Sequence, residues 1–450
     1  MNLSFMLADR AAENRPIRIG QIGAGKFGTM FLSQVHSTVG MHLTALADLQ
    51  PDRARERMET AGFAPEKSGA TSIDDALKTG ATHVTEDQMA LVNHPEIEVI
   101  IEATGDPANG IRIANAAIAA GKHIVMVNVE ADALAGPLLA RRAREAGVVY
   151  SLAWGDQPAL ICEHIDWARS CGFEVVAAGK GTRYHPTYHA STPETVWDIL
   201  AKYLVIEQRS HINPKMFNSF IDGTKSGIEM TAVCNAMGLV PQSKGLGFPP
   251  SSRFDLAEVC KPAADGGTLE KAGVTEVVSS ITREDTEVPH NLVMGTYVVI
   301  TSDSAYSQTC FREYNCLPDS SGRYAALYRP THMIGLELGL SVASAVLRNE
   351  PTGAPRVFNS DVVATAKRAL TAGEILDGEG GYCVWGKQQP ADVSLREGYL
   401  PLGLAHDVKL KCDLEDGAPV RWSDVDVDTS ADAVKFRREM EAAFSRPNVA

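Results

Sequence analysis

The sequence predicts an α/β protein in three parts: a doubly wound parallel sheet, an α+β domain and a small β-rich C-terminal module. The first observation is an apolar run, Ile17–Ile22, that ends in a glycine-rich turn. The second is an alternation of strand-like and helix-like stretches, which is typical of right-handed crossovers onto a parallel sheet. The third is that this pattern changes after the first third of the chain and again near Pro355. We therefore expect domains at 1–155, 156–355 and 356–450.

The glycine-rich turn reads Gly23-Ala24-Gly25-Lys26-Phe27-Gly28 and has the G-x-G-x-x-G spacing of dinucleotide sites. Gly23 allows the tight turn, Gly25 lets the backbone approach a pyrophosphate, and Gly28 lets the helix pack on the strand. Free N–H groups at the start of that helix would hold the phosphates. We expect the whole turn to contact a cofactor, which makes the first domain a Rossmann domain.

An acid at the end of the second strand strengthens this interpretation. The run Leu43–Ala47 is followed by Asp48, twenty positions after Gly28, where a carboxylate meets the adenosine ribose. Asp48 favours NAD because it repels the 2′-phosphate of NADP, whereas Arg53 or Arg55 could hold that phosphate if Asp48 turned away. Further cofactor contacts are expected after two later strands, from Thr104, Gly105 and Asn128.

The remaining elements follow from hydrophobic periodicity and from capping residues. We expect a short N-terminal helix on the outside of the first domain. That domain continues with helices over 53–61, 107–120 and 136–146 and strands over 99–105, which ends in a glycine turn, 123–127 and 148–153. The second domain has helices over 158–171, 215–237 and 331–347 and strands over 174–178, 274–281 and 292–301. The tail has short strand-like pieces after residue 369 and ends in a helix over 431–444.

Composition and charge exclude several classes of function. The chain has 450 residues and a formal net charge of −14, which disfavours nucleic acid and anionic membranes as partners. No apolar run reaches the roughly 20 residues that cross a bilayer, and Asp9 and Arg10 make the N-terminus a poor signal peptide. The eight cysteines include no C-x-x-C pair, so they suit structural roles in a reducing cytoplasm better than disulfides or a zinc site.

Several stretches along nearly the whole chain carry a family resemblance. They are the Gly23–Gly28 turn, Val127-Asn-Val-Glu-Ala-Asp132, Gly155-Asp-Gln-Pro-Ala159, Asp222-Gly-Thr-Lys225 with Glu229, and the pieces at 369–376 and 401–405. Together they resemble the homoserine-dehydrogenase-like oxidoreductases that carry a C-terminal SAF-type module. Within that group the sequence is most similar to the bacterial 1-deoxy-D-xylulose 5-phosphate reductoisomerase-like enzymes.

This resemblance implies a homo-oligomeric NADPH-dependent enzyme of isoprenoid precursor synthesis, a dimer or a tetramer. It would rearrange 1-deoxy-D-xylulose 5-phosphate, a phosphorylated sugar, and reduce the product to 2-C-methyl-D-erythritol 4-phosphate. We therefore lean to NADP(H), with NAD as the alternative. Two other hypotheses stay open: a dehydrogenase of the same group that acts on a sugar acid, a polyol or homoserine, and a non-catalytic dinucleotide sensor.

The implied chemistry needs a base and an electrophile that stabilises an oxyanion. The resemblance places these roles on or near one helix, at Asp222, Lys225 and Glu229, where the lysine would donate to a developing alkoxide. Lys225 and Glu229 share a helix face by their i,i+4 spacing, and an ordinary surface ion pair is the alternative. Asp156 either reaches the substrate from the last strand of the first domain or caps the helix that starts at Pro158.

A substrate phosphate would need cationic or backbone donors. Four candidates follow the strand at 174–178: Lys180, Arg183, Tyr184 and His185. Lysine, arginine and glycine at a strand end suit an anion, and a solvated basic loop is the alternative. Arg329 and His332 precede the helix expected at 331–347; they either add an anion contact at its N-terminus or form its entry turn.

No set of residues has spacing that names a metal site. Asp156, Asp222 and Glu229 could converge on Mg²⁺ or Mn²⁺, which prefer such oxygen ligands, whereas a lysine electrophile would make a metal unnecessary. His185 and His189 have i,i+4 spacing, but the proline between them argues against a shared helix and a two-histidine site.

Overall fold

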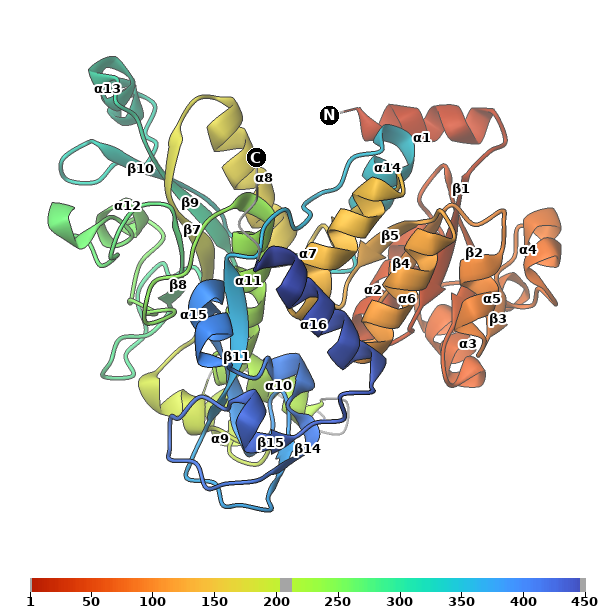
Figure 1. Cartoon of the computed structure of the whole chain (residues 1–450). Helices are drawn as coiled ribbons and strands as arrows, with labels where there is room; N and C mark the ends of the chain where they lie inside the picture. The colour runs from red at the N-terminus through yellow and green to blue at the C-terminus, as the bar shows by residue number, and fades with distance from the viewer. Residues whose placement is uncertain (1, 203–212, 446–450) are drawn as a thin grey trace. The chain divides into compact units, whose positions relative to one another are not determined.

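The computed structural model describes residues 2–202 and 213–445 (Figure 1). It divides into two compact units, each built from two stretches of the chain. The first unit contains Met1–Leu160 and Met333–Arg356, and the second contains Ile161–His332 and Val357–Ala450. No helix in the described part of the chain is long and apolar enough to cross a membrane.

The first unit is built on a parallel sheet of six strands in the order β3-β2-β1-β4-β5-β6. Its strands are β1 (Ile17–Ile22), β2 (Met41–Ala47), β3 (His83–Thr85), β4 (Val99–Glu102), β5 (His123–Met126) and β6 (Tyr150–Leu152). The strand order reverses between β1 and β4, as in doubly wound dinucleotide-binding sheets. The predicted Rossmann-type α/β fold is therefore confirmed.

Helices connect these strands, and α6 and α7 lie side by side against the sheet (Figure 1). They are α1 (Leu3–Ala12), α2 (Lys26–Val35), α3 (Pro51–Thr60), α4 (Ile73–Thr79), α5 (Gln88–Asn93), α6 (Pro107–Ala119) and α7 (Val129–Glu145). The region of β3, α4 and α5 was not predicted. Helix α7 begins seven residues before the predicted start at 136, because the Asn128 side chain caps it by accepting from Ala131 N at 3.1 Å.

A late helix, α14 (Gly339–Arg348), completes the core of this unit. Leu338, Val342 and Ala343 are buried in the same apolar cluster as residues of β1 and α2. The boundaries expected at 155 and 355 therefore need correction, since 333–356 groups with the first unit. The helix also starts later than the predicted Thr331. Gly335 has φ +80°, and a Cβ there would lie 2.6 Å from the Phe27 carbonyl oxygen.

The second unit contains a four-stranded sheet in the order β10-β9-β7-β8, in which only the β7–β8 pair is parallel. Its strands are β7 (Glu174–Thr182), β8 (Val274–Ser279), β9 (Thr296–Thr301) and β10 (Tyr324–Arg329), and its main helices are α8 (Gln157–Ser170), α9 (Val196–Leu200), α10 (Pro214–Ile221), α11 (Thr224–Met237), α12 (Leu256–Val259) and α13 (Ala305–Glu313). The single helix predicted at 215–237 is two helices, because Gly223 takes φ +94° between them.

The tail is β-rich, as predicted. It contains a two-stranded sheet of β11 (Ser360–Ala366) and β13 (Val384–Pro390), a three-stranded sheet of β12 (Ile375–Asp377), β14 (His406–Leu410) and β15 (Val425–Asp426), and the helices α15 (Ala391–Glu397) and α16 (Asp432–Phe444).

The tail is not a separate body, in contrast to the expected module at 356–450. Buried polar contacts join α11 to β11: Thr231 Oγ1 lies 2.8 Å from Ser360 Oγ, and Asn235 Nδ2 donates to Ser360 O at 3.1 Å. Because these groups are satisfied only when both segments are present, the tail and the central region form one unit.

Candidate functional site

The glycine turn of the first unit has the geometry that its sequence predicts. Gly23 has φ +98°, and a Cβ there would lie 2.5 Å from the Ala103 carbonyl oxygen. A Cβ at Gly28 would lie 2.4 Å from the Gly23 carbonyl oxygen, so α2 packs on the turn only with glycine at this position. Both glycines are thus required by close packing between β1, β4 and α2.

Gly25 differs from the other two glycines. It is the residue before α2, and a Cβ built on it would meet no atom within 4 Å. Gly25 and Lys26 are exposed, whereas Ala24 is buried and Phe27 is half-buried. The open space in front of Gly25 lies at the N-terminus of α2, where main-chain N–H groups and the helix dipole favour a phosphate.

Asp48 lies directly beside this turn. Its Oδ2 accepts a hydrogen bond from Ala24 N at 2.8 Å, and its Oδ1 accepts one from Gln50 N at 3.0 Å. The carboxylate is therefore held at the end of β2 by two main-chain donors. Arg53 is exposed on α3, and Arg55 lies 3.2 Å from the Asp52 carboxylate.

The other predicted cofactor residues follow β4 and β5 at the same edge of the sheet. Thr104 N donates to the Glu102 carboxylate at 3.1 Å, and Gly105 has φ +75° with open space where a Cβ would be. Asn128 Nδ2 donates to the Asp106 carbonyl oxygen at 2.9 Å. The structure thus gathers the ends of β1, β2, β4 and β5 into one dinucleotide-binding edge.

Glu102 is a functional candidate that the sequence reasoning missed. It is fully buried, and burial raises the pKa of its carboxyl to about 7. Its Oε1 accepts from Thr104 N and Oγ1, while its Oε2 has no hydrogen-bond partner among the described atoms. Glu102 therefore holds the Thr104–Gly105 turn in place. An acid at the end of the apolar run Val99-Ile-Ile-Glu was the signal available in the sequence.

In the second unit, the cations predicted to hold a phosphate are engaged within the protein. Lys180 lies in β7, is buried, and forms an ion pair with Glu229 of α11. Arg183 lies 3.5 Å from Asp285, which also pairs with Lys202 at 2.6 Å. Carboxylates thus contact both Lys180 and Arg183, which argues against the predicted anion-binding role.

The two aromatic candidates beside them also make internal contacts. The Tyr184 ring stacks on Phe248 with centroids 3.9 Å apart, and its hydroxyl lies 2.9 Å from His189 Nε2. His185 precedes a short 3₁₀ helix (Pro186–Ala190) and accepts from Thr187 N at 3.3 Å. Tyr184 therefore packs on Phe248 and contacts His189 within the protein, and His185 is part of the turn that leads into the 3₁₀ helix.

The predicted catalytic residues on and near α11 do not form the expected set. Glu229 pairs with Lys180, so its observed partner is not Lys225. Lys225 is the second residue of α11 and is half-buried. Asp222 is buried before α11 and forms an ion pair with Lys367, whose Nζ lies 2.7 Å from Asp222 Oδ2. The two predicted catalytic acids of the second unit, Glu229 and Asp222, thus form ion pairs with Lys180 and Lys367, respectively.

Asp156 belongs to the first unit, and its Oδ1 accepts a hydrogen bond from Gln157 N, at the start of α8. Arg329 ends β10, and His332 Nδ1 lies 2.8 Å from the Met294 carbonyl oxygen. Neither precedes a helix directly. Over residues 2–202 and 213–445, no group of three or more His, Cys, Asp or Glu side chains is arranged to hold a metal ion.

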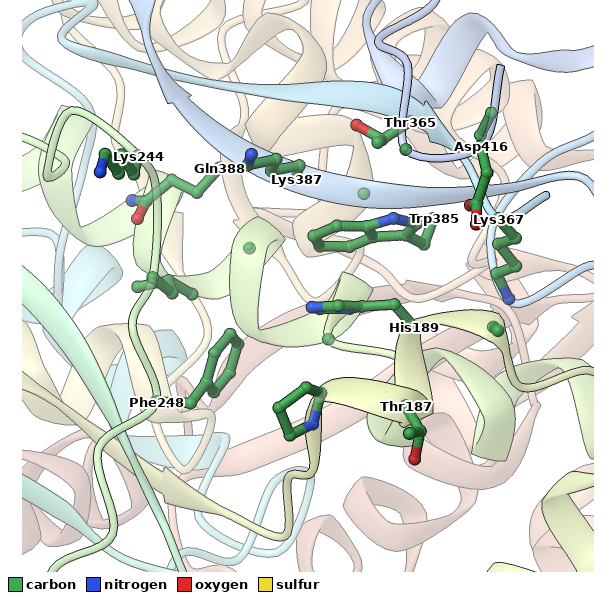
Figure 2. A pocket seen from close by; sticks show the side chains of 18 residues that line it. Thr187, His189, Lys244, Phe248, Thr365, Lys367, Trp385, Lys387, Gln388 and Asp416 are labelled. Atoms are coloured by element: carbon green, nitrogen blue, oxygen red, sulfur yellow. The ribbon is translucent and has the colours of Figure 1, made fainter. Parts of the chain in front are cut away.

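A cavity of about 590 Å³ lies within the second unit. Figure 2 shows the Trp385 and His189 rings face to face, with Lys387 on the same strand as Trp385. The lining comes from six segments of the chain: Pro186, Thr187, His189, Ala190; Gly223, Gly227; Lys244, Leu246, Phe248; Thr365, Ala366, Lys367; Trp385, Gly386, Lys387, Gln388; and Asp416, Gly417. The sequence did not predict this cavity, because its lining residues come from distant segments and no local pattern indicates that they lie together.

Hydrogen bonds fix the protonation of His189. Its Nδ1 lies 2.6 Å from the Asp222 carbonyl oxygen, which can only accept, so Nδ1 carries the proton. Its Nε2 then accepts from the Tyr184 hydroxyl at 2.9 Å. Burial also lowers the pKa of His189. The neutral ring therefore lines the cavity as an aromatic surface, stacked on Trp385 with centroids 3.8 Å apart.

Two family models match the chain. Residues 23–152 match the NAD-binding domain of homoserine dehydrogenase. Residues 155–338 match the catalytic domain of the oxidoreductase DRL. No curated protein matches. With the dinucleotide-binding edge, these matches identify an NAD(P)-dependent oxidoreductase that combines a homoserine-dehydrogenase-like NAD-binding domain with an oxidoreductase catalytic domain.

Several solved structures are similar to this chain at low identity and low TM-score. Levoglucosan dehydrogenase in complex with NADH and levoglucosan has 12% identity, covers 70% of this chain and 66% of its own, and gives a TM-score of 0.32. For myo-inositol dehydrogenase from Lactobacillus casei with NAD(H) and myo-inositol, these values are 16%, 40%, 50% and 0.27. For KijD10, a 3-ketoreductase from Actinomadura kijaniata, in complex with NADP, they are 19%, 37%, 49% and 0.25. These scores are too low to transfer a cofactor or a substrate.

Proposed function

We propose that the chain is a dehydrogenase that transfers hydride between a nicotinamide dinucleotide and a small polar hydroxy or carbonyl compound. The observation that carries this proposal is that the open space at Gly25 and the carboxylate of Asp48 lie on the same glycine turn, since Asp48 accepts a hydrogen bond from Ala24 N. Open space at a helix N-terminus suits a pyrophosphate, and a fixed carboxylate at the end of β2 suits the ribose hydroxyls.

The residues of the first unit fit the cofactor. Main-chain N–H groups at the start of α2 would bind the pyrophosphate, and Asp48 would accept hydrogen bonds from the adenosine ribose. Thr104 and Gly105, held by Glu102, would border the path of the dinucleotide. The nicotinamide supplies or accepts the hydride when it is bound.

We expect NAD(H) to fit better than the NADP(H) favoured by the sequence resemblance. The Asp48 carboxylate is held by Ala24 N and Gln50 N, so accommodating a 2′-phosphate would require breaking both hydrogen bonds. Arg53 is the exposed cation that could hold that phosphate once Asp48 is removed.

Lys225 is our candidate for proton transfer to or from the substrate oxygen. It lies in the first turn of α11 and is half-buried, in the stretch for which the sequence resemblance implies a catalytic role. We expect Lys225→Met to lower kcat strongly and Lys225→Arg to retain part of the activity. The KM for the cofactor should stay unchanged in both variants.

A second candidate is the reductoisomerase implied by the sequence resemblance. It is favoured by the lysines at the cavity, Lys244 and Lys387, which suit a phosphorylated sugar. It requires a rearrangement before hydride transfer, and Asp222 and Glu229, which were expected to serve that step, form ion pairs with Lys367 and Lys180. A dehydrogenase needs no rearrangement, so it requires fewer catalytic residues than a reductoisomerase.

A substrate panel tests both candidates. The protein is incubated with NAD⁺ or NADP⁺ and sugar acids, polyols or homoserine, and separately with NADPH, divalent metal and 1-deoxy-D-xylulose 5-phosphate. We expect absorbance at the reduced nicotinamide band to rise with a member of the first set. Consumption of NADPH only with the ketose phosphate, with a branched polyol phosphate as product, would replace the dehydrogenase by the reductoisomerase.

Three further expectations belong to this proposal. All eight cysteines are free thiols, which supports a reducing, cytoplasmic setting. A homo-oligomer is expected, and light scattering on the purified protein measures it. The SAF-type identity of the tail stays a prediction from the resemblance.

A further inference from the structure

The cavity of the second unit is formed in large part by residues outside both matched domains. Thr365–Lys367, Trp385–Gln388, Asp416 and Gly417 follow residue 338, where the second match ends. The C-terminal segment thus contributes walls that the matched catalytic domain does not contain. What these walls recognise is a property of this chain beyond hydride transfer.

The side chains that line the cavity carry more positive than negative charges. Three lysines and one aspartate line it in a protein whose net charge is −14. Lys367 is neutralised by Asp222, which lies buried behind the wall. Lys244 is exposed and lies near Glu270, whose pKa is lowered mainly by hydrogen bonds from Ser243 and to a smaller extent by the charge of Lys244. Lys387 is the remaining cation, and its position decides what the cavity can hold.

Lys387 has no carboxylate partner within the described parts of the chain. It lies in β13, where strand alternation places it on the same side as Trp385. Its stem passes over Gly245, where a Cβ would lie 3.5 Å from Lys387 Cε. The Lys387 residue is half-buried, and burial lowers the pKa of its ammonium. A partly desolvated charge without a counterion is costly, and a bound anion would remove that cost.

The wall beside Lys387 suits a carbon skeleton. Trp385 and His189 form a flat stacked pair, and both ring nitrogens of His189 are already hydrogen-bonded within the protein, while burial lowers its pKa and favours the neutral ring. Gln388 is committed to internal partners, since its Nε2 donates to Thr275 and Ser360. The recognition groups on this side are thus one ammonium and one aromatic face.

We propose that this cavity is a binding site for a small organic anion, a phosphate monoester or a carboxylate, whose charged group pairs with Lys387 and whose carbon skeleton rests on Trp385. The volume of about 590 Å³ accommodates a molecule the size of a sugar phosphate or a sugar acid. The proposal concerns binding alone, so it does not depend on the identity of the nicotinamide cofactor or on turnover.

Calorimetry on the full chain without cofactor tests this proposal. The probes are ribose 5-phosphate, ribonate and neutral ribose. We expect one of the two anions to bind and ribose not to bind. Lys387→Met should weaken binding of that anion by about tenfold or more, and Lys387→Arg should retain it. The matched control is Lys409→Met, which removes an exposed lysine of β14 outside the cavity and should bind like the wild type.

A second measurement avoids dependence on variant folding. Wild-type lysines are acetylated with and without the anion, and modification is read by mass spectrometry. Protection of Lys387 with unchanged labelling of Lys409 supports the proposal. Binding of neither anion, equal binding by Lys387→Met, or no protection of Lys387 would each overturn it. Because no nicotinamide is present, this result is separate from the success or failure of the dehydrogenase assay.

Discussion

The Lys367 ammonium lies 2.7 Å from the Asp222 carboxylate, and both side chains are almost completely buried. Lys367 also donates to the carbonyl oxygens of Ser191 and Gly381, each at 2.8 Å. Asp222 Oδ2 makes no directed hydrogen bond, so its attraction to Lys367 is that of an ion pair. One ammonium thus joins the end of β11, the start of α11 and the chain segment before β13.

Lys367→Met should therefore destabilise the second unit. The substitution leaves the Asp222 charge buried without a counterion, and such losses cost about 3–5 kcal/mol in the free energy of unfolding. Urea titration followed by circular dichroism measures the change. Lys409→Met serves as the control, and the double variant Asp222→Asn/Lys367→Met should recover part of the loss. A loss of under about 1 kcal/mol for Lys367→Met would contradict this account of the pair.

Substitutions at two glycines of the same turn should affect different properties, cofactor affinity at Gly25 and stability at Gly28. Gly25→Ala adds a Cβ into open space at φ −67°, so stability should not change, but the methyl group stands where the pyrophosphate approaches. We expect cofactor affinity to fall about tenfold or more. Gly28→Ala instead adds a Cβ 2.4 Å from Gly23 O and should cost about 1–3 kcal/mol of stability.

Calorimetry with NADH and thermal melts of both glycine variants separate these effects. Wild-type affinity in Gly25→Ala would mean that the cofactor phosphates do not lie against this turn. An unchanged melting temperature in Gly28→Ala would mean that the turn and α2 move apart easily.

The first unit was predictable because its signals are local. Gly23, Gly28 and Asp48 carry their roles in spacing alone, and the apolar runs of β1, β4 and β5 are continuous in sequence. The contacts of Lys180 and Lys367 were not predictable, since their partners Glu229 and Asp222 come from other elements. Basic residues near glycines look alike in a sequence whether a carboxylate of the same chain or a ligand neutralises them.

The helix predicted at 331–347 was assigned to the wrong unit for the same reason, since its packing partners are distant in the sequence. Its apolar periodicity predicted a helix correctly, but the sequence does not state which core that helix enters. Val342 and Ala343 pack with the first unit although the intervening 172 residues, 161–332, belong to the second. The helix start was misplaced because Gly335 is needed for a close approach to α2 and not for the helix.

Asp48→Asn should change the choice of cofactor. Asparagine keeps one oxygen acceptor for a main-chain donor but removes the charge that repels a 2′-phosphate. We expect the Kd of NADH to rise about tenfold and the Kd of NADPH to fall. Glu56→Gln, which removes an exposed acid of α3, is the matched control. A wild-type protein that already prefers NADPH would show that Asp48 leaves the ribose when the cofactor binds.

Stability should fall as the pH rises from about 4 to about 7. Asp132 is fully buried in α7; its Oδ1 accepts from the Tyr150 hydroxyl at 2.8 Å, and burial raises its pKa from 3.8 to about 7. A raised carboxyl pKa means that the unfolded chain loses the proton first, so the stabilisation is complete below the unfolded pKa and is lost as the pH rises through the folded pKa. The loss is roughly 4 kcal/mol at most. Glu102 acts in the same direction.

Asp132→Asn removes one part of this dependence. Urea titrations at pH 5 and pH 8 should show a smaller difference in the variant than in the wild type, whereas Asp9→Asn, at an exposed acid, should leave the difference unchanged. An equal slope with pH in Asp132→Asn and wild type would show that Asp132 is ionised in the folded protein.

The split composition of the first unit has a consequence for biosynthesis. A ribosome that has completed the six strands must still synthesise the whole of 161–332 before α14 emerges and covers the apolar surface left by β1 and α2. Nascent chains halted before residue 333 should therefore recruit chaperones or aggregate, and a fragment ending at residue 160 should need α14 supplied through a short fused linker to stay monodisperse.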